Sequence, residues 1–158
     1  MMDQPVSVTL FVFVPPNEMV PEAELAGFER SRLDVSYQQE GSMQISTREV
    51  MVDISDALQW MVPGLCFDGI VALRKSGEYS LDLFASDERI AMRRNGDEIE
   101  LKGEYIEPKV FPADAFETAM IEAGRRYLAL SARLWPDRSE SEVQNLNERA
   151  SAAGAIVP

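Results

Sequence analysis

Two aspartates that lie three residues apart are the best candidates for acid–base chemistry in this sequence. Asp53 and Asp56 stand between an apolar run and a helix predicted over residues 57–62. Two carboxylates held close together can have pKa values driven in opposite directions, so that one acts as an acid and the other as a base. The alternative is structural, because Asp56 can cap the helix while Asp53 is a solvated turn residue. We favour the structural interpretation and keep a small-molecule-binding protein or small enzyme that uses this pair as the second hypothesis.

The other side chains that commonly carry chemistry are scarce. The sequence has no histidine and one cysteine, Cys66, which lies between Leu65 and Phe67. Catalysis by a Ser-His-Asp or Cys-His arrangement and imidazole-based metal sites are therefore excluded. Without a histidine base, Cys66 is expected to be a small buried apolar residue. The sequence also lacks a phosphate-binding loop, a dinucleotide-binding glycine pattern and a nucleophile elbow, so we predict no catalytic residue, no cofactor and no metal.

The charge balance favours a basic protein as the partner. The chain has 158 residues, with 15 Lys and Arg against 27 Asp and Glu and a net charge of −12. Such a surface opposes nucleic acid and anionic membranes, whereas carboxylates on the outward side of a sheet can steer a basic partner. The candidate partner-binding residues are Asp82, Asp87, Glu98, Glu100, Glu104 and Trp60. An equally weighted alternative is a solvated face with cross-strand ion pairs, for example Arg93 opposite Glu98.

The strands that must position these residues are predicted from alternating apolar residues. One strand is predicted at residues 6–14, and a hairpin around Gly41 is predicted from strands at residues 33–37 and 43–45. Residues 50–52 are predicted to continue the second strand of this hairpin. An antiparallel meander is predicted over residues 67–103, with strands at 67–74, 79–84, 89–94 and 98–102. Asn95-Gly96 is the strongest turn signal, because both central positions tolerate a positive φ. Residues 21–30 are predicted as either a short helix or an ordered loop.

Three helices are predicted. The short one at residues 57–62 ends at Pro63, and Trp60 lies off its apolar stripe, which indicates exposure. The longest begins at Asp114 as N-cap, with Glu117 reaching back to the cap, and Gly124 marks a close approach of this helix to the sheet. Its apolar stripe consists of Phe116, Met120, Ala123, Tyr127, Leu130 and Leu134. A weaker helix starts at Ser139, and residues 152–158 are expected to be a frayed tail.

Several short segments resemble those of a known group of bacterial proteins. These segments are residues 60–66 (WMVPGLC), 103–105 (GEY), 111–112 (FP) and 124–127 (GRRY). In their order they are similar to the small cytoplasmic immunity proteins encoded beside bacterial polymorphic toxins, over residues 55–135, about half of the chain. The resemblance implies stoichiometric binding of a cognate toxin domain and occlusion of its active site without catalysis. It assigns no role to any individual residue.

These observations predict one α+β domain, with an antiparallel sheet packed by a long C-terminal helix and a short helix between two β-rich halves. The N-terminus lacks the basic segment of a secretory signal and residues 6–14 are too few to span a bilayer, so we expect a cytoplasmic location. The first hypothesis is an immunity protein that occludes a basic toxin domain with its acidic surface. A structural subunit or adaptor is the third, and its marker is an apolar surface patch large enough for self-association.

Overall fold

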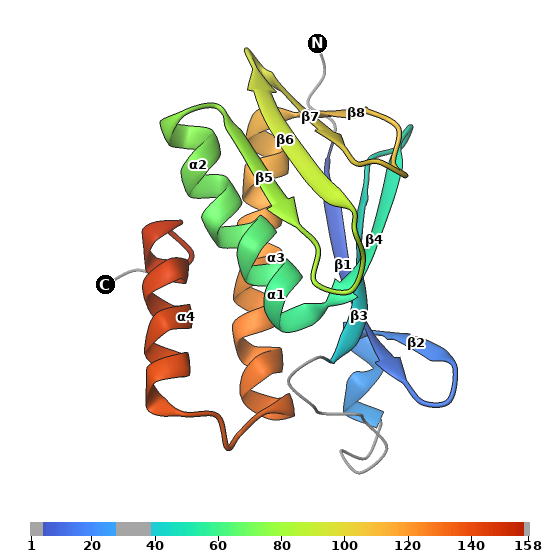
Figure 1. Ribbon diagram of the computed structural model, residues 1–158, viewed down its shortest axis with the longest axis vertical. Helices are drawn as coiled ribbons and strands as arrows, with labels where there is room; N and C mark the ends of the chain where they lie inside the picture. Colours follow the sequence, from blue (N-terminus) through green and yellow to red (C-terminus); the bar gives the residue numbers. More distant parts are fainter. Residues whose placement is uncertain (1–4, 28–38, 157–158) are drawn as a thin grey trace.

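In the part of the chain that the structure describes, eight strands form two separate antiparallel sheets, and the α-helices lie on one side of them (Figure 1). A computed structural model describes residues 5–27 and 39–156 (Figure 1). Sheet A has the order β2-β1-β3-β4, and sheet B the order β5-β6-β7-β8. The strands are β1 Ser7–Val14, β2 Glu18–Pro21, β3 Glu40–Ser46, β4 Met51–Ala57, β5 Glu78–Asp82, β6 Arg89–Asn95, β7 Glu98–Lys102 and β8 Lys109–Pro112. The helical segments are η1 Glu22–Gly27, α1 Leu58–Pro63, η3 Gly64–Asp68, α2 Gly69–Lys75, α3 Ala113–Leu134 and α4 Glu140–Ala152. The chain therefore has the predicted α+β class, with two sheets and a long helix near its C-terminal end.

Sheet A is built around β1, whose alternate side chains enter the core. Val8, Leu10, Val12 and Val14 are buried on the inner face, as the alternation predicts. The strand expected at residues 33–37 lies outside the described residues, while the one expected at 43–45 is β3. Residues 50–52 do not extend that strand but turn back into β4, because the hydroxyl of Thr47 accepts hydrogen bonds from two backbone N–H groups in the turn. Residues 22–27 form the 3-10 helix η1, which partly agrees with the helix alternative for residues 21–30.

The segment from α1 to α2 runs as one helical stretch, and two predictions fail here. Pro63 does not end the helix, and residues 67–74 are not a strand. A π-turn in η3, in which the Gly69 N–H donates to the Gly64 carbonyl, carries the helix past the proline. A short apolar run that contains Phe67 and Ile70 fits a buried strand and a buried helix equally well, so its period could not decide between them.

The long helix α3 occupies the centre of the fold and confirms the predicted stripe, since all six stripe residues are buried. Its start differs from the prediction. Pro112 is the N-cap position without a side-chain cap, and Asp114 is exposed. Gly124 does mark a close approach, but the neighbour is the π-turn: a Cβ atom there would lie 2.4 Å from Cε1 of Phe67. This contact joins two helical segments rather than a helix and a sheet.

A buried carboxylate joins three of these elements. Glu117 on α3 accepts a hydrogen bond from Arg74 Nε on α2 at 2.9 Å and another from Arg94 Nη1 on β6 at 2.5 Å. Its side chain is 11% exposed, so removal of its charge from water must be compensated by these two guanidinium groups. Arg74 also donates to the carbonyl of Ala153 at the end of α4. Glu117 is therefore a tertiary contact, not part of a capping box.

The chain end lies against this framework. Ser139 caps α4 as predicted, with its hydroxyl accepting the Glu142 N–H at 3.2 Å. Ala153 and Ala155 are buried, and Arg125 on α3 donates to the Ala155 carbonyl at 2.8 Å. Up to residue 156 the tail is thus held by contacts, in contrast to the frayed segment expected over 152–158. Residues 157–158 lie outside the described part.

Sheet B confirms the hairpin around Asn95-Gly96, where Gly96 has a φ of 64°. Ile90, Met92, Ile99 and Leu101 share its buried face. The register corrects one expected ion pair: Arg93 lies opposite Glu100, and Glu98 lies opposite Asn95. Within the described residues, every helix is too short or too polar to cross a membrane.

Replacing the buried carboxylate tests its role. Glu117→Gln is expected to lower the free energy of unfolding by about 3 kcal/mol, because two guanidinium groups lose their shared negative partner. Asp114→Asn is the matched control, since the Asp114 side chain is 98% exposed and also lies within reach of Arg94. The control should change stability by less than about 0.5 kcal/mol in urea unfolding. Equal losses for the two variants would contradict the assignment.

Gly124→Ala separates helix propensity from packing. Propensity alone predicts stabilisation by about 1 kcal/mol. The contact with Phe67 instead predicts a loss of about 1 to 3 kcal/mol, because the new methyl group overlaps an aromatic ring inside the core. Urea unfolding decides by the sign of the change, and a more stable variant would show that the helices separate without cost.

Candidate protein-binding surface

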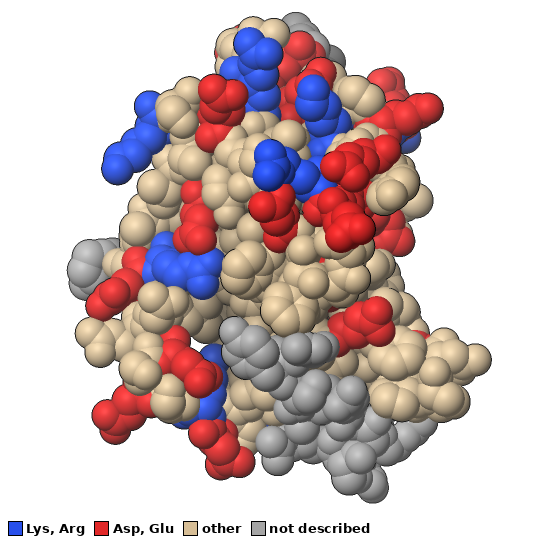
Figure 2. Space-filling view, viewed as in Figure 1, with Lys and Arg blue, Asp and Glu red and all other residues tan. Residues whose placement is uncertain are grey.

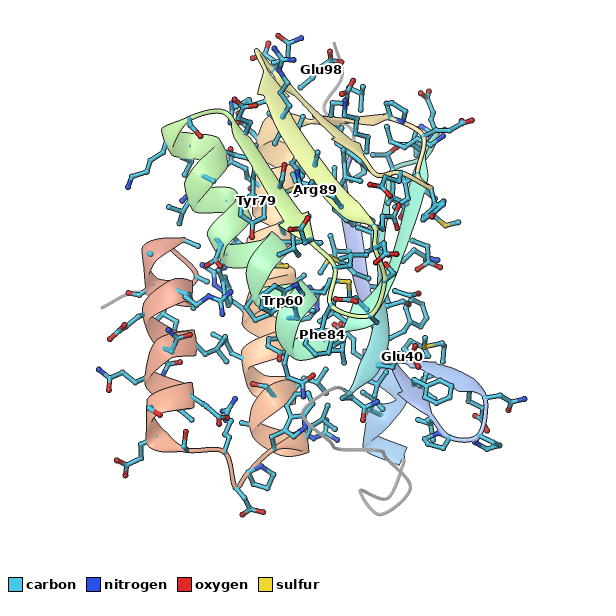
Figure 3. All side chains as sticks on the ribbon, viewed as in Figure 1. Glu40, Trp60, Tyr79, Phe84, Arg89 and Glu98 are labelled. Atoms are coloured by element: carbon cyan, nitrogen blue, oxygen red, sulfur yellow. The ribbon has the colours of Figure 1, made fainter. Side chains whose placement is uncertain are left out.

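An exposed pair of aromatic side chains stands out where sheet B meets α1. The ring centroids of Trp60 on α1 and Phe84 after β5 lie 6.2 Å apart, and each side chain remains 45% exposed (Figure 3). The Trp60 Nε1–H donates to the Asp82 carbonyl at 2.7 Å. Because the polar atom of the indole is satisfied inside the protein, the exposed remainder of the side chain is apolar. The prediction that Trp60 is exposed is confirmed.

Asp56 fixes the backbone that carries Phe84. Its carboxylate is 1% exposed and accepts hydrogen bonds from the backbone N–H groups of Phe84 at 3.0 Å and Ala85 at 2.7 Å. The predicted role of Asp56 as a helix cap is therefore wrong, since the N-cap position of α1 is Ala57, without a side-chain hydrogen bond. Its partners come from a loop distant in sequence, which no local pattern could indicate.

The pairing of Asp53 with Asp56 for catalysis is also wrong. Both residues belong to β4, where side chains an odd number of positions apart point to opposite faces. Asp53 lies on the exposed outer face, while Asp56 points inward to the loop after β5. The two carboxylates cannot share a proton, so the small-enzyme hypothesis loses the residues on which it depended.

Three of the predicted acidic residues gather around the aromatic pair. Asp82 ends β5 next to Trp60 and pairs with Arg89 at 2.6 Å, and the hydrogen bond from Arg89 lowers the pKa of the Asp82 carboxyl. The charge of Glu104 also acts on Arg89. Asp87 is exposed in the loop between β5 and β6.

A fourth carboxylate makes the surrounding loops one unit. Glu88 Oε2 accepts the backbone N–H of Tyr105 at 2.8 Å, which ties the β5–β6 loop to residues 103–107. Asp82, Asp87 and Glu104, with Trp60 and Phe84, therefore form one surface, which we call the Trp60 surface.

Glu98 and Glu100 lie elsewhere. Glu98 lies opposite Asn95, which is the last residue of β6. Arg89, which pairs with Asp82 at the Trp60 surface, is the first residue of the same strand. At about 3.4 Å per residue, the length of β6 separates Glu98 from the Trp60 surface by about 20 Å. Figure 3 shows Glu98 at the far end of sheet B from Trp60. The structure thus divides the predicted acidic set between two ends of one sheet.

The outer face of sheet B between these ends has mixed charge. Its outward residues are Glu78, Ser80, Asp82, Arg89, Ala91, Arg93, Asn95, Glu98, Glu100, Lys102, Val110 and Pro112. Four are acidic and three are basic, and in the register they alternate across the strands. Figure 2 shows the same mixture of positive and negative side chains over this sheet. The face itself fits the predicted alternative of cross-strand ion pairing, and the acidic character belongs to the loops at the Trp60 end.

The sequence contained a signal for Phe84 that the prediction did not use. Tyr79, Leu81 and Leu83 face inward in the alternation of this segment, so Phe84 falls on the outward side with Ser80 and Asp82. A large aromatic residue on a polar face is unusual enough to indicate a binding surface. No comparable signal existed for Asp56 or Glu88, whose roles depend on tertiary contacts.

Other chemistry-bearing groups have structural roles. Cys66 is fully buried, and burial raises the pKa of its thiol to about 12, so it remains a neutral thiol at physiological pH. Burial, with Asp68 nearby, raises the pKa of Tyr79 to about 12. In residues 5–27 and 39–156, no three Cys, Asp or Glu side chains gather as metal ligands.

A cleft of about 380 Å³ lies between α1, α3 and α4. Two arginines line it. Arg149 is held by both oxygens of Asp68 at 3.0 and 2.7 Å, and Arg138 donates to the buried hydroxyl of Ser131 at 2.6 Å. Arg149 joins α4 to η3, and Arg138 joins the connection before α4 to α3, so both arginines help to hold α4 in place.

Substitutions of the two aspartates of β4 test whether Asp56 stabilises the loop that carries Phe84. Asp56→Ala should lower the free energy of unfolding by about 2 to 4 kcal/mol, because two backbone N–H groups lose a charged acceptor. Asp53→Ala, on the exposed face of the same strand, should change it by less than about 0.5 kcal/mol. Urea unfolding measures both, and similar values would show that the loop does not depend on Asp56.

No family model, curated protein or solved structure matches this chain.

Proposed function

We propose that this chain is a non-catalytic, cytoplasmic immunity protein that binds a basic bacterial toxin domain and occludes its active site. The observation that carries the proposal is the Trp60–Phe84 pair, exposed but held in place from behind and bordered by carboxylates. Aromatic residues of this kind dominate binding energy at protein interfaces when they are fixed and surrounded by polar groups. A prearranged pair also loses little conformational entropy when a partner covers it.

The charge of the Trp60 surface supports a basic partner. Asp87 and Glu104 are exposed, and the chain as a whole has a net charge of −12. Long-range attraction between such a surface and a basic domain raises the association rate and selects the partner by charge. Asp82 is less available, since it is already paired with Arg89. We therefore assign steering to Asp87 and Glu104, and anchoring to Trp60 and Phe84.

The narrower identity as a toxin inhibitor comes from the resemblance in residues 55–135. That stretch contains α1 and the loops of the Trp60 surface, so the resembling segments and the exposed aromatic pair belong to the same part of the chain. Occlusion requires only a stable complementary surface and no reacting group. The structural roles of Asp56, Cys66 and Glu117 agree with a protein that acts by binding.

Binding kinetics with charge-reversed variants test the proposal. The partner is first isolated on the tagged protein from a lysate of the organism that carries the gene, and identified by mass. Asp87→Lys with Glu104→Lys should then slow its association at least about tenfold at low salt and weaken the salt dependence. Trp60→Ala should accelerate dissociation about thirtyfold, the effect of an interface anchor worth about 2 kcal/mol.

The matched control is Glu98→Lys with Glu100→Lys, which changes the net charge equally but at the far end of sheet B. It should alter the association rate much less than the Asp87 and Glu104 reversal. If the control slows association more, the binding surface lies at the Glu98 end. A bait that captures no stoichiometric basic protein contradicts the proposal itself.

A further inference from the structure

Strand β2 pairs with only half of β1. Its last pair along β1 is Phe11 opposite Pro21, and at Glu22 the chain turns into η1. Within the described residues, positions 7–10 of β1 therefore pair with β3 on one edge and with no strand on the other. The place that a longer β2 would occupy is left beside the first half of β1.

Side chains take the place of a strand on part of this open edge. The Glu22 carboxylate accepts the Leu10 N–H at 3.0 Å. Arg126 on α3 pairs with Glu22 and donates to the Val8 carbonyl at 2.5 Å. Because the main-chain groups of alternate residues point to the same edge of a strand, the N–H of Val8 and the main-chain groups of Val6 also point to this edge. Such a row of groups is a template for pairing with another extended segment.

A groove of about 1050 Å³ runs along the open edge, and we call it the β1 groove. Residues 5–9 form one wall, and α3, which runs beside β1 (Figure 1), forms the other. On α3 the small side chains of Ala115, Thr118 and Ala119 line the groove, so little of the space beside β1 is filled from the helix. The lining extends along α3 from residue 113 to residue 126, which is about 20 Å at 1.5 Å per residue. An extended segment of about six residues has the same length.

The lining of the β1 groove is acidic. Its charged side chains are Glu22, Asp97, Asp114, Glu122 and Arg126. Four carboxylates and one guanidinium group give a net charge of −3. Asp114 and Glu122 also contact arginines that do not line the groove, but both side chains are at least half exposed. Ion pairs at this exposure are weak, so the two carboxylates can bind the cationic side chains of a partner.

We propose that the β1 groove binds a short extended segment of a partner protein, with lysine or arginine at alternate positions, as a strand added to β1. The main chain of the segment pairs with Val6 and Val8, and its cationic side chains contact the carboxylates of the lining. Main-chain pairing supplies affinity, whereas the carboxylates select for positive charge. No residue of the Trp60 surface lines the groove, so the inference does not depend on the proposed function.

NMR titration of the isotope-labelled full chain tests this inference. The probe is a capped heptapeptide in which lysine alternates with valine or threonine. Amide signals of residues 6–10 and 115–122 should shift with a dissociation constant on the order of 0.1 to 1 mM, because the contact is much smaller than the about 800 Å² that each partner buries in a stable complex. At saturation, the added strand should slow hydrogen exchange of the Val8 amide at least about tenfold.

A second peptide separates main-chain pairing from charge. The same heptapeptide with all its main-chain nitrogens methylated keeps its charge but has no N–H donors, and it should bind at least about tenfold more weakly. Equal affinity for the two peptides overturns the proposal, because charge alone then accounts for binding. Shifts confined to the Trp60 surface, or no shifts in β1 and α3 up to about 5 mM peptide, also overturn it.

Variants of the groove test where the peptide lies. Thr118→Trp fills the groove from an exposed position on α3 and should weaken binding at least about tenfold. Ala129→Trp is the matched control, since Ala129 is exposed on the same helix but does not line the groove. If Thr118→Trp does not fold, Asp97→Lys provides a second variant, with Glu140→Lys on α4 as its control of equal charge. A folded Thr118→Trp or Asp97→Lys that binds the peptide as tightly as the parent chain overturns the assignment to this groove.

Discussion

The arrangement of this molecule depends on one buried carboxylate between two arginines. Glu117 on α3 accepts hydrogen bonds from Arg74 on α2 and Arg94 on β6, and Arg74 continues to the end of α4. A charge this deep in the protein is tolerated only while both guanidinium groups stay in place, so the contact fixes sheet B relative to the helices. With that relation fixed, the end of β5 reaches α1, where Trp60 meets Phe84.

Patterns that act within one element predicted their structures correctly. The hairpin at Asn95-Gly96, the α3 stripe and the Ser139 cap all depend on neighbours in sequence. The failures share a tertiary cause. Asp114 and Glu117 have the spacing of a capping box, but two distant arginines compete successfully for the Glu117 carboxylate. Pro63 has the position of a helix stop, but a π-turn packed against Gly124 carries the helix onward.

The candidate surface shows the same limit. The position of Trp60 off its helix stripe predicted its exposure, and the alternation before Phe84 could have predicted the second ring. The composition predicts that the surface is acidic, but it does not predict where the acidic side chains lie on it. Glu98, Glu100 and Asp82 are close in the chain, yet the register of sheet B separates Asp82 from Glu98 by the length of a strand. The position of Asp56 before α1 suggests a helix cap, but its carboxylate holds a loop instead, and no local pattern predicts this role because its hydrogen-bond partners are 28 and 29 residues away.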